Sequence, residues 1–236
     1  MAKNRGRGRN RRRAPQEEDE TIVDIIGTGE KVQDFFEENQ TTILGAVAGV
    51  LLLVGAYFAY SIFYMAPLEQ TASSQLYKAE QTFAQDSLTK ALTQPDGGYP
   101  GFIEMVEEYG STNSGDISNL YAAISYLRLG KYEVAIDYLD DYDGGGKVAS
   151  IIRQGLKGDA YAELNDFDSA LSYYKKAANA SDNEFLSPYY LLKLGMLNEK
   201  QGNGSAAKDA YQKIKSKYPN STQGKDIDKY LQRVAG

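Results

Sequence analysis

One stretch near the start of the chain contains no charged side chain. The run from Asn39 to Leu68 is 30 residues long, and its centre, from Ile43 to Met65, is 23 residues that are nearly all apolar. At about 1.5 Å rise per residue, a helix of that length covers the roughly 30 Å hydrocarbon core of a bilayer. Helices buried inside soluble domains rarely run this long without a charge. The sequence therefore predicts a transmembrane helix over residues 41–66, surrounded by membrane lipid.

The span is predicted to remain in the protein as an anchor. The apolar part of a cleaved signal peptide is usually about 7–15 residues long and follows a short basic segment. Here the apolar run is longer, 42 residues precede Ile43, and no small-residue cleavage motif follows Met65. Aromatic side chains gather at the far end of the run, as is typical of a membrane interface. They are Tyr57, Phe58, Tyr60, Phe63 and Tyr64.

Charge in the first residues predicts the orientation of the anchor. Seven of the first 13 residues are Lys or Arg, and positive charge resists translocation, so the N-terminus is expected in the cytoplasm. Residues 1–20 are low in complexity and predict a disordered tail. An alternative is that this tail contacts RNA or anionic lipid weakly through its arginines. Residues 21–40 have the spaced apolar side chains of a short amphipathic juxtamembrane segment.

The composition excludes most catalytic chemistry. The chain has no Cys and no His, so neither a Ser–His–Asp arrangement nor a zinc site with His or Cys ligands can form. Adjacent carboxylates such as Asp140 and Asp141 diverge by about 100° on a helix and do not face each other. We therefore predict no enzyme activity, no catalytic, cofactor-binding or metal-binding residues, no cofactor and no small-molecule substrate. Residues 69–236 hold 18 basic and 23 acidic side chains, which argues against nucleic acid as their partner.

An internal repeat predicts the fold of the larger part of the chain. Three segments share a small residue, an alanine twelve positions later, and a bulky residue four positions after that. The offsets between segments are 35 and 37 residues, close to the period of about 34 residues of tetratricopeptide repeats. A small residue lets the two helices of a hairpin approach closely, and the bulky residue fills the gap between hairpins. The three sets are Ala123, Ala135 and Leu139; Gly158, Ala170 and Tyr174; and Gly195, Ala207 and Tyr211.

The predicted fold class is all-α: one N-terminal transmembrane helix followed by a tetratricopeptide-repeat α-solenoid over residues 67–236. Spacing of apolar residues predicts one long helix over residues 69–93 and a shorter helix over 102–109, which would pair with it. Residues 224–234 are expected to form the C-terminal capping helix that a solenoid needs.

One cytoplasmic tail, one span and an exported tetratricopeptide array resemble the ancillary SecYEG translocon subunit family of bacterial inner-membrane proteins, over about residues 21–235. The stretches GKYEVAIDYL and SDNEFLSPYYLLKLGMLNEKQG are similar to single-pass tetratricopeptide proteins of the Bacteroidota. The resemblance implies a periplasmic C-terminal domain. It also implies two partners, the SecYEG translocon and a membrane-anchored periplasmic chaperone of the prolyl isomerase type. One alternative is a scaffold for cell-envelope assembly, serving outer-membrane insertion, cell division or a dedicated secretion system. Another is that the tail holds RNA or ribosomes at the membrane.

First helices of tetratricopeptide repeats line a concave face, and we expect a partner segment to lie across it. The alternative for each residue is that it only packs between helices. The candidate groove residues are Ile124, Arg128, Ile152, Asp159, Glu163, Tyr189, Leu192 and Met196. Within the span, a small-xxx-small pattern lets another helix approach closely. The candidate helix-contact residues there are Gly45, Gly49, Leu52 and Ala56.

Overall fold

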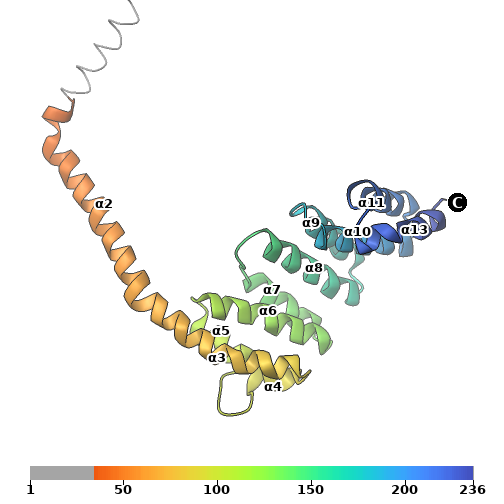
Figure 1. The fold of residues 1–236 in the computed structure, drawn as a ribbon, viewed down its shortest axis with the longest axis horizontal. Coiled ribbons are helices and arrows are strands. Elements are labelled where there is room, and N and C mark those ends of the chain that lie inside the picture. The colour runs from red at the N-terminus through yellow and green to blue at the C-terminus, as the bar shows by residue number, and fades with distance from the viewer. Residues whose placement is uncertain (1–34, 236) are drawn as a thin grey trace, which may run out of the picture. The chain divides into compact units, whose positions relative to one another are not determined.

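The computed structural model describes residues 35–235 of the chain, and its regular elements there are all helices (Figure 1). These residues belong to two compact units, residues 35–61 and residues 62–235. The predicted tail, residues 1–20, and most of the juxtamembrane segment, residues 21–40, lie outside the described residues. The all-α class is as predicted.

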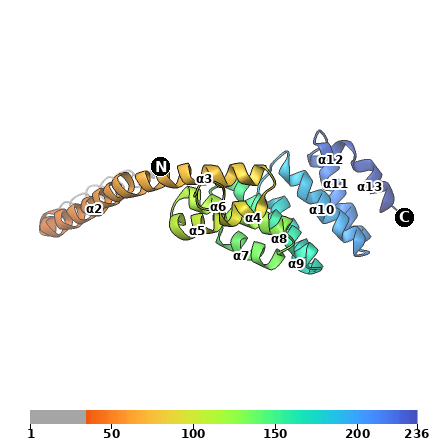
Figure 2. The same cartoon turned by 90° about the horizontal axis from the view of Figure 1, so that it is seen from below.

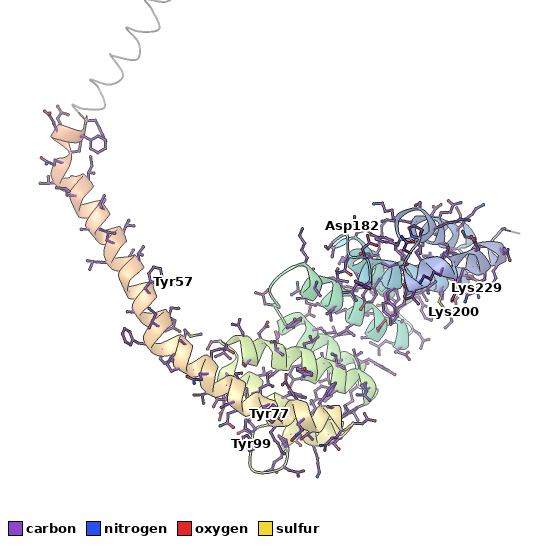
Figure 3. All side chains as sticks on the ribbon, in the orientation of Figure 1. Tyr57, Tyr77, Tyr99, Asp182, Lys200 and Lys229 are labelled. Carbon is purple, nitrogen blue, oxygen red and sulfur yellow. The ribbon has the colours of Figure 1, made fainter. Side chains whose placement is uncertain are left out.

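The first unit contains α2, Gln40–Tyr60. Its residues are uncharged throughout and none of them is buried, and Tyr57 points away from the helix axis (Figure 3). The helical stretch Gln40–Ala84 is long and apolar enough to cross a membrane. This stretch contains the predicted span of residues 41–66.

A short π-helical segment, η1 (Ser61–Met65), follows α2 and precedes Pro67. Proline has no backbone N–H, so it cannot bond the carbonyl four residues before it, and its ring crowds that carbonyl. A local switch to the wider π-helical pattern is one of the ways in which a helix accommodates such a site. Pro67 itself occupies the first turn of the next α-helix, where its missing donor costs nothing.

The second unit is a succession of helices that pack on their neighbours (Figure 2). In the repeat region α6 packs on α7, α8 on α9 and α10 on α11, and contacts of α7 with α8 and of α9 with α10 join these hairpins. The α-helices of this unit are α3 (Ala66–Ala84), α4 (Leu88–Thr93), α5 (Phe102–Tyr109), α6 (Asn113–Arg128), α7 (Tyr132–Asp141), α8 (Lys147–Glu163), α9 (Phe167–Asn179), α10 (Leu186–Lys200), α11 (Gly204–Lys217), α12 (Thr222–Lys225) and α13 (Ile227–Arg233).

The prediction of one helix over residues 69–93 is wrong. The chain leaves α3 after Ala84, and Asp86 has a positive φ of 62°, which a continuing α-helix does not allow. The new helix α4 then starts at Leu88, and Leu88 and Leu92 are both buried. The apolar spacing was therefore correct, but it also fits two helices joined by a tight turn.

Helices α3 to α6 share one apolar core. The rings of Phe102 and Tyr121 stack with centroids 5.0 Å apart, and Phe83 contacts both rings edge-on. Helix α5 touches α3 and α4 as expected, but it also packs along α6. The helices α3, α4 and α5 therefore close the N-terminal end of the repeat array, rather than forming a simple hairpin.

Within two hairpins, the glycine of the repeat pattern packs against its bulky residue, which was expected in the gap between hairpins. Gly158 on α8 faces the ring of Tyr174 on α9, and a Cβ atom added at Gly158 would overlap that ring. Gly195 on α10 faces Tyr211 on α11 in the same way. A further contact joins adjacent hairpins, because Gly155 of α8 lies against the ring of Tyr190. The alanines of the pattern, Ala135, Ala170 and Ala207, are all fully buried.

The C-terminal end of the array is capped by two short helices. The predicted helix over residues 224–234 is interrupted at Asp226, where α12 ends and α13 begins. Ile227 is buried in the core of the last repeats, and the ring of Tyr230 lies 5.4 Å from that of Tyr211. Apolar residues on one side of α13 thus cover the end of the core, as expected of a cap.

Candidate functional site

A concavity of about 380 Å³ opens between the first helices of the three repeats. Residues of α6, α8 and α10 line it, together with one residue each from α7 and α9. Four of the eight predicted groove residues lie here, namely Ile124 and Arg128 on α6 and Asp159 and Glu163 on α8. The other lining residues are Leu127, Tyr132, Leu156, Ala162, Tyr174 and Lys193.

Asp159 is the centre of a polar network on one side of the concavity. It accepts hydrogen bonds from Lys193 Nζ at 2.6 Å and from the hydroxyl of Tyr174 at 2.7 Å. Lys193 also lies over the ring of Tyr189, 4.9 Å from its centroid. Burial disfavours the ammonium form of Lys193, but the Asp159 carboxylate outweighs burial and raises its pKa. Burial, reinforced by Asp159, raises the pKa of Tyr174 far above its usual value. The polar groups of Lys193 and Tyr174 are thus satisfied by Asp159 within the chain.

Arg128 and Glu163 differ in how their charges are compensated. Arg128 forms an ion pair with Asp86 and lies over the ring of Phe83, 5.7 Å from its centroid. Glu163 is exposed near the C-terminal end of α8, and the hydroxyl of Tyr132 lies 3.5 Å from its Oε2 atom. Among the described residues, no cationic side chain pairs with Glu163.

The remaining four predicted groove residues lie on the same helices but outside the concavity. Ile152 is half-buried on α8, and Leu192 is half-buried against the core of the last repeats. Tyr189 and Met196 are exposed on α10, four residues before and three residues after Lys193. Since residues three and four apart share a helix face, both lie on the face of α10 that carries Lys193. The structure therefore gathers four predicted residues and places the others alongside them.

Six lining residues were missed by sequence reasoning, and three of them, Lys193, Tyr174 and Tyr132, carry polar groups. Lys193 has the helical spacing to Tyr189 and Met196 that would have included it. Tyr174 was assigned to packing alone, whereas its ring packs on Gly158 and its hydroxyl reaches Asp159. Tyr132 stands at the start of a second helix, and no periodicity relates it to the first helices.

The predicted contact residues of the span share one exposed face of α2. Gly45, Gly49, Leu52 and Ala56 follow one another at intervals of four, three and four residues. A Cβ atom added at Gly45 or Gly49 would meet nothing within 4 Å. Within the described chain, this face is open to lipid or to another helix.

Comparison with known proteins supports the class that the geometry defines. Stacked helical hairpins with a concave face form an α-solenoid, an architecture that presents extended binding surfaces. Residues 154–184 and residues 189–221 each match a model of the tetratricopeptide repeat, and they cover most of α8–α9 and α10–α11. A search of curated proteins finds no match. The matches support a tetratricopeptide-repeat protein, and such proteins are generally non-enzymatic scaffolds that bind other proteins.

Proposed function

We propose that this protein is a membrane-tethered scaffold that binds a segment of a partner protein across the concave face formed by α6, α8 and α10. The observation that carries the proposal is the concavity itself, which gathers Ile124, Arg128, Asp159 and Glu163 from two successive first helices. The repeats matched in α8 to α11 generally mediate binding to proteins. The proposal involves neither a catalytic residue nor a cofactor.

The tether is α2. Its uncharged surface is compatible with lipid on every side, and Gln40–Ala84 has the length and composition of a span. The basic residues before it favour a cytoplasmic N-terminus. On this basis we place the protein in a bacterial inner membrane as a single-pass protein, with the repeat unit in the periplasm.

The partners that fit this placement best are the SecYEG translocon and a membrane-anchored periplasmic chaperone of the prolyl isomerase type. The support for them is the resemblance in domain order and in the tyrosine-rich repeat segments. A scaffold for cell-envelope assembly has the same fold, orientation and groove, and differs only in its partner. Partner identity therefore decides between the two functions.

Gentle purification of the tagged full-length protein from its native membrane, followed by mass spectrometry, tests the proposal. We expect near-stoichiometric recovery of Sec components and a prolyl isomerase. Recovery of outer-membrane assembly, division or other secretion components without Sec would move the protein to the alternative function. Recovery of no specific protein at all would contradict the scaffold proposal.

The same purification tests the small-residue face of α2. We expect Gly45→Leu with Gly49→Leu to lower recovery of a membrane partner by at least about fivefold, because the added side chains prevent close approach of a second helix. A matched control is Ala46→Leu with Val50→Leu, which adds bulk on another side of α2. Equal recovery with both double variants would show that this face makes no specific contact.

A further inference from the structure

We propose that the concave face takes an apolar polypeptide segment that carries a Lys or Arg side chain toward the C-terminal end of α8. The proposal deepens the proposed function, because it names the chemistry of the partner that the scaffold binds. It is carried by the distribution of exposed apolar side chains and by the way in which the charges of the groove are paired.

Exposed apolar side chains concentrate on the first helices. Among residues 66–235, nine large hydrophobic side chains are exposed. Five of them lie on α6, on α8, or on α10 and its N-cap residue. Monomeric proteins do not usually gather their exposed apolar residues on one face without a binding role. These five, with exposed fractions between 40% and 83%, are Ile117, Val148, Phe185, Tyr189 and Met196.

Helical spacing places these side chains on the groove face. On α6, Ile117 precedes the lining residue Ile124 by seven positions, which is about two helical turns. On α8, Val148 precedes the lining residue Asp159 by eleven positions, about three turns. Each is therefore on the same side of its helix as a residue that lines the concavity, but nearer the N-terminus of that helix.

Phe185 and Tyr189 repeat this arrangement on the third hairpin. Phe185 is the N-cap residue of α10 and the most exposed of the five side chains. Tyr189 follows one turn later, and Lys193 one turn after that. The N-terminal halves of the three first helices therefore present an apolar surface, which we call the apolar half of the groove: Ile117, Val148, Ile152, Phe185 and Tyr189.

The cations of the groove are already paired within the chain. Lys193 bonds Asp159 at 2.6 Å, and Arg128 pairs with Asp86. Each cation would have to leave its own pair before it could bind a partner's carboxylate, and loss of the partly buried Lys193–Asp159 pair would leave Asp159 without its compensating charge. The groove therefore does not favour an acidic segment.

The uncompensated charge of the groove is negative. Glu163 is exposed at the end of α8, where the helix dipole adds partial negative charge. A cationic side chain of the partner would be attracted to this position. Ile152 and Glu163 are eleven residues apart on α8, which corresponds to about 16 Å, the reach of about five extended residues. This spacing sets the register of the partner segment.

Peptide binding to the full-length protein in lipid nanodiscs tests the proposal. The probe is a fluorescein-labelled synthetic peptide with a short Leu/Phe run, a spacer of about five Ser and Gly residues, and a terminal Lys. A second peptide has Glu in place of Lys, and empty nanodiscs measure binding to lipid alone. By fluorescence anisotropy, we expect the Lys peptide to bind at least about fivefold more tightly than the Glu peptide.

Variants of exposed residues separate the two parts of the proposal. Val148→Ser with Phe185→Ser should weaken binding of the Lys peptide by at least about tenfold. The matched control, Tyr99→Ser with Val134→Ser, removes two exposed apolar residues from outside the first helices and should leave affinity unchanged. Glu163→Lys should reverse the preference between the two peptides, so that the Glu peptide binds more tightly than the Lys peptide.

Three results would overturn the proposal: a Glu peptide that binds wild type as tightly as the Lys peptide, groove variants that match the control, or no binding of either peptide. The last result leaves the proposed function standing if native partners are still recovered from the membrane. Failure of that recovery would instead remove the scaffold function on which the proposal rests.

Discussion

Gly195→Leu is expected to destabilise the repeat unit by about 3 kcal/mol, at the upper end of what overpacking costs in a filled core. A Cβ atom at this position would already overlap the ring of Tyr211, and the remaining leucine atoms require still more room. Tyr211 cannot easily give way, because its side chain is fully buried and its hydroxyl bonds Glu199 Oε2 at 2.8 Å. For a unit of this size, the change corresponds to a fall in Tm of about 10 °C.

Thermal unfolding followed by circular dichroism measures this effect on the full-length protein. Gly204→Leu is the matched control, because Gly204 lies on α11 of the same hairpin and an added Cβ atom there meets nothing within 4 Å. We expect the control to lower Tm by no more than a few degrees. Equal losses in the two variants would mean that close contact between α10 and α11 does not hold the hairpin together.

Leu52→Arg with Leu53→Arg is expected to remove the protein from the membrane. Both leucines are exposed near the middle of α2, and an arginine at the centre of a spanning helix costs about 3 kcal/mol for insertion. Two such residues outweigh much of the favourable transfer of the remaining apolar side chains. We expect most of the variant protein to appear in the soluble fraction after alkaline carbonate extraction.

The control for this experiment carries the same charges elsewhere. Tyr77 and Tyr99 are exposed in the second unit, on α3 and in the loop after α4, where they lie close together (Figure 3). Tyr77→Arg with Tyr99→Arg should stay in the membrane pellet like wild type. Retention of the α2 variant in the pellet would show that something other than this helix attaches the protein to the membrane.

Local patterns in the sequence predicted the long apolar helix and the repeats well. The structure places α2 within the apolar run, and the helical stretch there is long and apolar enough to cross a membrane. The fixed spacing from Gly158 to Tyr174 and from Gly195 to Tyr211 predicted closely packed hairpins, and each ring lies against the glycine of its own hairpin. Such features depend on residues close together in the chain, where periodicity alone carries the information.

Features that depend on distant residues could not be predicted in this way. Asp86 breaks the expected helix, and the same residue pairs with Arg128, which is 42 positions away. Lys193 and Asp159 are 34 positions apart and meet only because two hairpins stack. Periodicity identified the helix faces that form the groove. It could not show that the cations on those faces are already paired.

Photo-crosslinking from the groove in intact cells tests whether the concave face binds the partner protein. A photoreactive amino acid is placed at Ile152, in the apolar half of the groove beside the concavity, or at Val134, which is exposed on the second helix of the first repeat. We expect discrete protein adducts from position 152, lost when Val148→Ser and Phe185→Ser are added, and none of these adducts from position 134. The same adducts from both positions, or none from position 152, would contradict a scaffold that binds its partner through the concave face.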